Sequence, residues 1–282
     1  ETAAGFVERL PPLIDDDHEL DVIGGTAGCL AALLALQKFR PSDAVMNAAI
    51  QCGEHLLATA KPMPAGIGWL TIGSATPLAG FSHGCSGIAS ALGELWAVTG
   101  DERYRKAAID AVVYERSQFI PAIGNWPRPE TAPAEKEDRM ALSVAWCYGA
   151  PGIGMARLRL LQSIDHPMLR EDLAVAVETT LSEGFGTNHC LCHGALGNLD
   201  FLIQADELLG DPELHSRVAL MTGSILDSIT RDGWLCGVPL GVESPSLLNG
   251  LAGIAYGLLR VAEPRRMPSI LALDSPMATL AV

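Results

Sequence analysis

The sequence predicts an all-α fold built from repeated helical hairpins, and three observations support this. A Gly-x-x-Gly motif recurs, each copy opens an apolar helical stretch, and no segment has the alternating pattern of a strand. The copies begin at Gly25, Gly84, Gly149, Gly194 and Gly250, at intervals of 59, 65, 45 and 56 residues. Repeated hairpins either stack as an open solenoid or close into a toroid, where equivalent positions of every repeat face one hub.

Each motif is followed by a mostly apolar helix, expected at 26–40, 85–99, 150–163, 195–209 and 251–262. The first four of these are followed by a helix with charges on one face, expected at 42–60, 101–120, 167–184 and 212–231. Ser42, Asp101 and Asp211 stand at N-cap positions, and Gly100 and Gly210 stand where helices stop. The apolar helices should be inner and the charged helices outer.

The composition indicates a globular chain and excludes some partners. Of the 282 residues, 49% are hydrophobic and 18% are charged, which allows a sizeable core. The formal charge of -14 argues against nucleic acids and anionic membranes, because both bind basic surfaces. No apolar run approaches the ~18–20 residues of a membrane span. We expect no nucleic-acid partner and no membrane span.

The cysteines and the chain start bear on the cellular setting. Seven cysteines at irregular spacings lack the pattern of a secreted disulfide scaffold, which favours a reducing cytoplasm. The chain starts at Glu1 without a Met or a signal-peptide pattern, so we expect a piece of a longer polypeptide. Residues 121–138 are rich in proline and end in the charged run Glu135-Lys-Glu-Asp138, as in a loop.

The residues just before each motif are of metal-ligand type. One position before the first glycine stand Gly24, His83, Tyr148, His193 and Asn249, and two positions before it stand Ile23, Ser82, Cys147, Cys192 and Leu248. A helix N-terminus favours a thiolate, and two thiolates with one imidazole bind zinc well. Three protein ligands with an open fourth position are typical of catalytic zinc. Cys147, Cys192 and His193 are therefore candidate ligands of one zinc ion, against the alternative that the cysteines are core residues.

The remaining cysteines and histidines are expected to be structural. Cys29, Cys52 and Cys85 are assigned to the core, Cys190 is placed outside the ligand set, and Cys236 is assigned to a loop. The histidines outside the shared positions are expected on the surface or at helix caps: His18, His55, His166, His189 and His215.

Several motifs carry a family resemblance. Trp146-Cys-Tyr-Gly-Ala-Pro-Gly152 and Cys192-His-Gly-Ala-Leu-Gly-Asn198 resemble the zinc-ligand motifs of the lanthionine cyclase (LanC-like) family. Asp21-Val-Ile-Gly-Gly25 and Phe81-Ser-His-Gly84 resemble that family's other two active-site motifs. The segments 245–260 and 267–273 are similar to the C-terminus of class II (LanM-type) lanthipeptide synthetases, in which a dehydratase domain precedes the cyclase.

The resemblance covers nearly the whole chain and implies an α/α toroid with Zn2+ at its hub. It implies an enzyme that adds Cys thiols of a dehydrated precursor peptide to dehydroalanine or dehydrobutyrine, which forms thioether rings. His83 is expected to protonate the resulting enolate, with an inert histidine or a fourth ligand as alternatives. Asp21 is expected to orient a histidine or take the thiol proton, or else to cap a helix, and Tyr148 to line the pocket.

The sequence departs from the family in two respects. Some members have an arginine four residues before the first zinc cysteine, where this chain has Ser143, so the role of that arginine is unfilled unless Arg139 substitutes. The family's barrel also has more hairpins, and residues 1–20 are too few to supply them. We therefore expect residues 1–282 to form a partial cyclase domain, an N-terminally incomplete toroid being one explanation, with residues 264–282 as a C-terminal tail.

Other functions remain compatible with the same fold. Toroidal prenyltransferases include a carboxylate among their zinc ligands, and toroidal glycosidases need two carboxylates, whereas Asp21 is the one carboxylate expected near the hub. A non-enzymatic alternative keeps the zinc and makes the protein a binder of thiol peptides or glutathione. The Asp21 and His83 pair favours chemistry over binding alone.

Overall fold

The computed structural model describes residues 3–126 and 143–275 of the chain. Within these ranges it contains eleven α-helices, one short two-stranded ribbon and one 3-10 helix, so the all-α prediction is confirmed. The part of the expected loop that follows residue 126, including Arg139, lies outside the described residues. Residues 276–282 of the expected tail also lie outside them.

The long helices form two layers. The inner helices begin at the Gly-x-x-Gly motifs: α3 (Thr26–Phe39), α5 (Cys85–Thr99), α7 (Ala150–Leu161), α9 (Ala195–Leu209) and α11 (Leu251–Ala262). The outer helices follow the first four: α4 (Asp43–Thr59), α6 (Glu102–Ser117), α8 (Pro167–Glu183) and α10 (Pro212–Asp232). Burial separates the layers as expected, because α7 is buried along almost its whole length, whereas α10 buries only Leu214, Val218 and Ile225.

Several short elements were not expected from the sequence. They are α1 (Ala3–Val7), α2 (Leu10–Asp15), β1 (Lys61–Pro62), β2 (Ile67–Gly68) and η1 (Pro239–Gly241). The strands β1 and β2 pair antiparallel, and both α1 and α2 pack against α4. Each of these elements is too short to show a helical or alternating period in the sequence, so tertiary contacts rather than local pattern define them.

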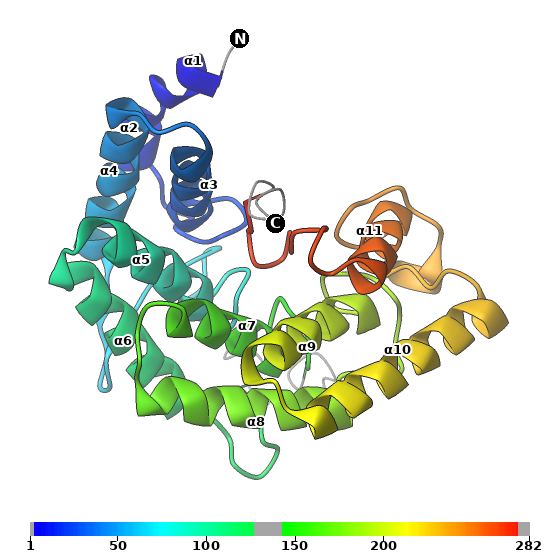
Figure 1. Cartoon of the computed structure of the whole chain (residues 1–282). Helices are drawn as coiled ribbons and strands as arrows, with labels where there is room; N and C mark the ends of the chain where they lie inside the picture. The colour runs from blue at the N-terminus through cyan, green and yellow to red at the C-terminus, as the bar shows by residue number, and fades with distance from the viewer. Residues whose placement is uncertain (1–2, 127–142, 276–282) are drawn as a thin grey trace.

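The hairpins follow one another in an arc from α3 to α11, with the inner helices on its concave side (Figure 1). After α11 the chain returns to the middle of this arc (Figure 1). There the indole N–H of Trp146 donates to the Leu271 carbonyl over 3.1 Å, and the side chains of Ser269 and Leu271 are buried. The described part of the C-terminal tail is therefore packed against the turn that precedes α7.

The second glycine of each motif is required by close packing. A Cβ atom added at this position would lie 1.8–2.2 Å from the carbonyl oxygen six residues earlier, in all five copies: Gly28, Gly87, Gly152, Gly197 and Gly253. No other residue fits there, because the helix starts directly on the backbone of its own preceding turn. Each Gly-x-x-Gly motif therefore marks the same kind of turn, which leads into an inner helix and occurs five times. We call these five segments the hub turns.

The predicted helix ends are confirmed by their hydrogen bonds. The side chains of Ser42, Asp101 and Asp211 accept hydrogen bonds from backbone N–H groups in the first turns of α4, α6 and α10, at 3.2, 3.0 and 2.9 Å. Gly100 and Gly210 end α5 and α9 in the left-handed conformation, with φ of 72° and 60°. These caps satisfy backbone groups at the helix ends in three of the four hairpins.

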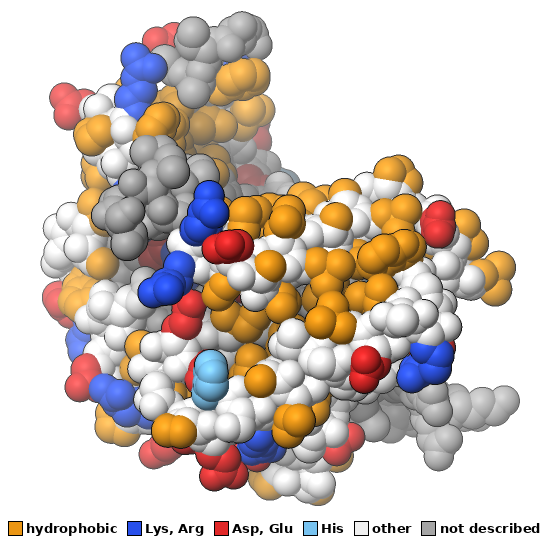
Figure 2. Space-filling model, turned by 45° about the vertical axis from the view of Figure 1, so that its right-hand side comes forward, with side chains coloured by type: hydrophobic (Ala, Val, Ile, Leu, Met, Phe, Trp, Pro, Cys, Tyr) orange, Lys and Arg blue, Asp and Glu red, His pale blue; other side chains and the backbone are white. Residues whose placement is uncertain are grey.

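Hydrophobic side chains gather on the face formed by the α9–α11 end of the arc, which Figure 2 brings forward. Exposed leucines on this end include Leu208 and Leu209 of α9, Leu220 of α10 and Leu259 of α11. In the part of the chain that the structure describes, no helix combines the length and apolar character needed to cross a membrane.

Candidate metal centre

The hub turns of successive repeats are joined by hydrogen bonds between equivalent positions. The backbone N–H of Cys147 donates to the Cys192 carbonyl over 3.3 Å, and the N–H of Cys192 donates to the Leu248 carbonyl over 3.0 Å. The Ser82 hydroxyl donates to the Cys147 carbonyl over 3.2 Å. Residues that occupy the same position in successive repeats therefore lie side by side, as the alignment of the motifs predicted.

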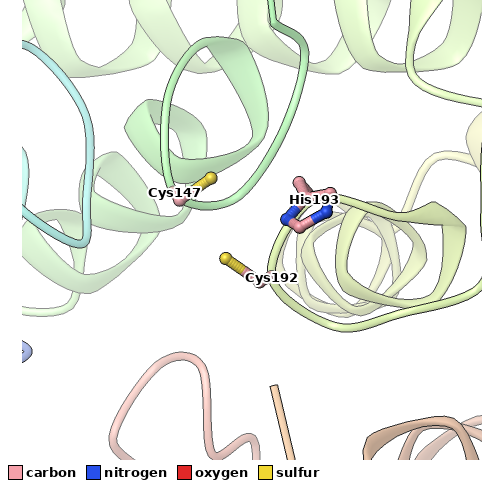
Figure 3. A group of neighbouring side chains, drawn as sticks. All are labelled: Cys147, Cys192 and His193. Atoms are coloured by element: carbon pink, nitrogen blue, oxygen red, sulfur yellow. The ribbon is translucent and has the colours of Figure 1, made fainter. Parts of the chain in front are cut away.

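This arrangement brings together Cys147 from the turn before α7 and Cys192 and His193 from the turn before α9 (Figure 3). One ligand-type atom from each of the three lies within 4.8 Å of the other two. All three side chains are partly buried. Among the described residues this is the one such group of His, Cys, Asp and Glu side chains, and His83 is not part of it.

The donor set fits zinc. Zinc lies about 2.3 Å from thiolate sulfur and about 2.0–2.1 Å from imidazole nitrogen, so tetrahedral ligand atoms stand roughly 3.5–4 Å apart. The observed upper limit of 4.8 Å means that small side-chain movements would bring the three atoms to that spacing. Two soft sulfurs with one imidazole select zinc over the hard cations calcium and magnesium, which prefer oxygen.

The two thiols also need a cation if both are to ionise. The hydrogen bond with the Cys147 thiol, together with burial, raises the pKa of Cys192 well above its ordinary value. In the protein alone, the Cys192 thiol therefore keeps its proton. A divalent cation between the two sulfurs would supply the charge that stabilises both thiolates.

The imidazole of His193 is oriented by the backbone. Its Nε2 atom lies 3.0 Å from the carbonyl oxygen of Gly237. Because a carbonyl can only accept, Nε2 must carry the proton, which leaves Nδ1 with its lone pair as the ligand atom. Metal-binding histidines in proteins usually have this kind of hydrogen bond on their second nitrogen.

A second polar pair joins the first two hub turns. The Nδ1 atom of His83 lies 2.6 Å from Oδ2 of Asp21, whose side chain is buried, while that of His83 is 26% exposed. The other oxygen of Asp21 accepts hydrogen bonds from the N–H groups of Ile23 and Gly24, at 2.9 and 2.8 Å. The Asp21 carboxylate is thus held from both sides and in turn fixes the ring of His83.

The structure separates some of the alternatives for these residues. Asp21 is not the cap of α3, because Gly25 occupies the N-cap and Asp17 accepts the hydrogen bond from the N–H of Thr26 at 2.8 Å. The ring of Tyr148 lies 6.2 Å from the ring of His83, centroid to centroid. Asp21, His83 and Tyr148 therefore belong to adjacent hub turns, as expected, although their chemical roles stay predictions.

The cysteines assigned to structural roles are buried or half-buried and are not members of the ligand group: Cys29, Cys52, Cys85, Cys190 and Cys236. Cys190 lies behind the site rather than in it. Its sulfur accepts a hydrogen bond from the backbone N–H of His193 at 3.4 Å. Burial raises the pKa of the Cys190 thiol, which keeps it protonated and is consistent with a structural role.

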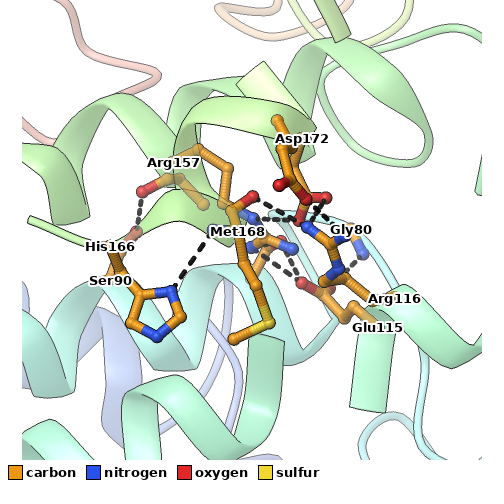
Figure 4. A network of polar contacts seen from close by, with 11 residues as sticks. Gly80, Ser90, Glu115, Arg116, Arg157, His166, Met168 and Asp172 are labelled. Carbon is orange, nitrogen blue, oxygen red and sulfur yellow. Dashed lines mark hydrogen bonds and ion pairs between the residues drawn. The ribbon is translucent and has the colours of Figure 1, made fainter. Parts of the chain in front are cut away.

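A buried network of ion pairs supports the turn that carries Cys147 (Figure 4). Arg157, fully buried on α7, lies 3.0 Å from Glu115 of α6 and 3.0 Å from Asp172 of α8. Glu115 also accepts a hydrogen bond from the N–H of Gly80 at 3.1 Å. A Cβ atom at Gly80 would lie 2.7 Å from the carbonyl oxygen of Cys147, so this network fixes the backbone against which the Cys147 turn packs.

Two contributors to the site were not found by the sequence analysis. Asn125 holds the start of α7, since its side chain accepts from the N–H of Ala150 at 2.9 Å and donates to the Ser143 carbonyl at 3.1 Å. Gly237 lies in the segment that was assigned only a structural role. Neither residue has a local signal, because both act on residues that are distant in the sequence.

Comparisons with known proteins identify relatives of this chain. The family model of lanthionine synthetase C-like proteins matches residues 1–272. The lacticin 481/lactococcin biosynthesis protein LcnDR2 of Lactococcus lactis subsp. lactis is 30% identical over 195 residues, which cover 65% of this chain and 20% of that protein. The chain thus spans about a fifth of the length of this curated relative.

Solved structures share the fold at low sequence identity. Nisin cyclase has a TM-score of 0.67 and 17% identity, over 98% of this chain and 72% of that one. A cellobiose 2-epimerase from Spirochaeta thermophila has a TM-score of 0.59 and 13% identity, over 90% of this chain and 72% of that one. The predicted α/α toroid is confirmed, and because the same fold carries different reactions, chemistry must be argued from the site.

Proposed function

Because this chain belongs to the lanthionine synthetase C-like family, we propose that it is the zinc-dependent cyclase of a class II lanthipeptide synthetase. The observation that carries the proposal is the group formed by Cys147, Cys192 and His193. It combines the ligand types of catalytic zinc with a position on a hub turn that is hydrogen-bonded to the turn of His83, through the Ser82 hydroxyl and the Cys147 carbonyl.

The substrate in this proposal is a precursor peptide that contains Cys together with dehydroalanine or dehydrobutyrine. We assign the preceding dehydration of Ser and Thr to a dehydratase domain upstream in the same polypeptide. The match covers only 20% of the length of the Lactococcus relative, which is compatible with a separate domain for dehydration. We place the protein in the cytoplasm, where its thiol ligands would stay reduced.

Cys147, Cys192 and His193 would hold one zinc ion, whose positive charge would lower the pKa of a peptide thiol so that it could react as the thiolate. The reaction breaks the S–H bond of the thiol and forms a bond between that sulfur and the β-carbon of the dehydro residue. The α-carbon must receive a proton in place of the one that the thiol has lost, so the mass is unchanged. The chain's own residues therefore have two tasks. They orient the peptide and deliver one proton.

His83 is the residue that we propose delivers this proton. Asp21 accepts the hydrogen bond from Nδ1, so proton exchange falls to Nε2. The buried carboxylate holds the ring in one orientation. Tyr148, on the neighbouring hub turn, would line the space in which the peptide is placed.

Other reactions on this fold are less well supported by the site. A glycosidase needs two carboxylates on either side of a sugar bond. The ligand group at this hub consists of two thiols and an imidazole, and the neighbouring pair adds one carboxylate, that of Asp21. The non-catalytic alternative, zinc-dependent binding of a thiol peptide or of glutathione, would use the same ligands. It gives no task to the Asp21 and His83 pair.

The test is to incubate the zinc-loaded protein with a dehydrated peptide that contains Cys, and to follow its free thiol by alkylation. Cyclisation removes the alkylatable thiol while the peptide mass stays constant. Cys147→Ala should abolish this loss, because one thiolate ligand is removed. A wild-type protein that binds the peptide tightly but leaves its thiol open to alkylation would support the binding alternative instead.

A further inference from the structure

We propose that Gly237 is a positioning residue for the metal centre and acts through His193. Its carbonyl fixes the tautomer and orientation of the imidazole, and its missing side chain makes room for that contact. The inference rests on the proposed zinc site. It adds to that site a residue 44 positions away from His193 in the sequence.

Three separate segments meet behind the imidazole. The turn before α9 is joined to the segment after α10 by two hydrogen bonds. The backbone N–H of His189 donates to the Leu235 carbonyl over 2.8 Å, and the N–H of Leu235 donates to Nδ1 of His189 over 3.1 Å. The N–H of Gly237 donates to the carbonyl of Asn249, in the turn before α11, at 2.8 Å. Gly237 is thereby held from both sides, and its carbonyl has a defined position against Nε2 of His193.

The contact leaves no room for a side chain at position 237. A Cβ atom there would lie 2.4 Å from the sulfur of Cys190 and 2.8 Å from Nε2 of His193. Gly237 is not among the glycines with positive φ, so its backbone conformation is open to other residues. The requirement for glycine therefore arises from these two neighbours and not from backbone strain.

The chemical effect of the contact is on Nδ1 of His193. While Gly237 accepts from Nε2–H, the lone pair of the imidazole stays on Nδ1 and the ring cannot flip. A hydrogen bond of this kind also makes the ligand nitrogen more basic. A displaced ring would bind the cation less well even though all three ligand residues were still present.

The test is Gly237→Ala in the otherwise unchanged chain. We expect the zinc Kd, measured by competition with a chromogenic chelator, to rise about 10- to 100-fold, as is usual when a partner of a metal ligand is disturbed. The visible spectrum of the Co2+-loaded protein should change as well, because it reports the ligand geometry directly. Gly223→Ala is the matched control, since a Cβ atom there would meet nothing within 4 Å, and it should leave both readouts unchanged.

A double variant separates the two contacts and guards against loss of folding. Cys190→Ala removes the sulfur that lies nearest to the added methyl group, so Cys190→Ala/Gly237→Ala should fold even where Gly237→Ala does not. The contact with His193 remains in this variant, and we expect it still to bind zinc about 10-fold or more weakly than Cys190→Ala alone.

The inference is overturned if Gly237→Ala folds and binds zinc within about twofold of the wild type, less than the 10-fold minimum expected for a ligand's partner. It is also overturned if the double variant matches Cys190→Ala, because Gly237 would then serve only Cys190. Failure of the zinc proposal itself would be recognised separately, by a wild-type protein that binds no zinc in the same competition assay.

Discussion

The imidazole of His83 and the carboxylate of Asp21 form a pair across two successive hub turns, with 2.6 Å between Nδ1 and Oδ2. Two backbone N–H groups hold the other carboxylate oxygen, so the pair has one arrangement. In a histidine held in this way, one ring nitrogen is hydrogen-bonded to the carboxylate and the other is available for proton transfer. The proposed division of tasks between this pair and the three metal-ligand residues can be tested one residue at a time.

Replacing His83 by Asn should leave zinc bound and slow cyclisation. The imidazole is not part of the ligand group, and loss of a general acid typically lowers a rate by about 10²- to 10⁴-fold. Metal content and single-turnover rate are the two measurements. A His83→Asn protein that has lost its zinc would instead identify His83 as a fourth ligand.

Removal of either thiol ligand should remove the metal. Cys192→Ala or Cys147→Ala leaves one sulfur and one imidazole, too few charged donors for a stable site. Elemental analysis after dialysis should show stoichiometric zinc in the wild type and almost none in either variant. Cys52→Ala is a suitable control, because this buried thiol lies on α4 and outside the ligand group. Retention of stoichiometric zinc in both ligand variants would exclude the assignment.

Arg157→Met should destabilise the fold strongly. The substitution leaves the buried carboxylate of Glu115 without its partner, and breaking a buried pair in this way costs about 3–5 kcal/mol. Arg170→Met, which removes an exposed ion pair with Asp165, should cost about 0–1 kcal/mol. Urea unfolding measures both differences. Adding Glu115→Gln to Arg157→Met should recover part of the loss, since the unpaired charge is gone.

Stability should fall when the pH drops below about 6.5, in part because of His189. Burial lowers the pKa of His189, with partial compensation from the negative charge of Asp232. The unfolded chain therefore takes up a proton near pH 6.5 that the folded protein does not, and acid favours unfolding until the lower folded pKa is reached. Above about pH 6.5 the contribution of His189 to the stability of the folded protein is fully present.

The check on this pH dependence is the difference in Tm between neutral and mildly acidic buffer. His189→Gln should make this difference smaller, because the variant has no ionisable group there. Equal pH dependence in wild type and His189→Gln would contradict the prediction.

Much of the fold could be predicted because the chain repeats itself. Pairs of glycines three residues apart, each followed by an apolar stretch, locate the inner helices. Caps such as Asp101 locate the outer helices. Aligning the repeats also placed Cys147 beside Cys192, although 45 residues separate them, because equivalent positions in a toroid share one axis. Because the chain repeats, an alignment of its repeats predicts which residues lie close together in the fold.

What the sequence could not supply is contact between parts that do not repeat. Asn125 bonds to Ala150 and Ser143, and Gly237 bonds to His193 and Asn249. Nothing in their neighbouring residues indicates such partners. The helices α1 and α2 are stabilised by packing on α4 and are too short for a periodic signal.

The five hub turns have a consequence for how new activities arise on this scaffold. In each turn the second glycine packs against backbone and tolerates no change, whereas the pair of residues before the motif is a different combination in each of the five copies. Stability and chemistry are thus encoded at separate positions. A reaction centre around the axis can be exchanged residue by residue, by evolution or by design, while the helices that carry it stay the same.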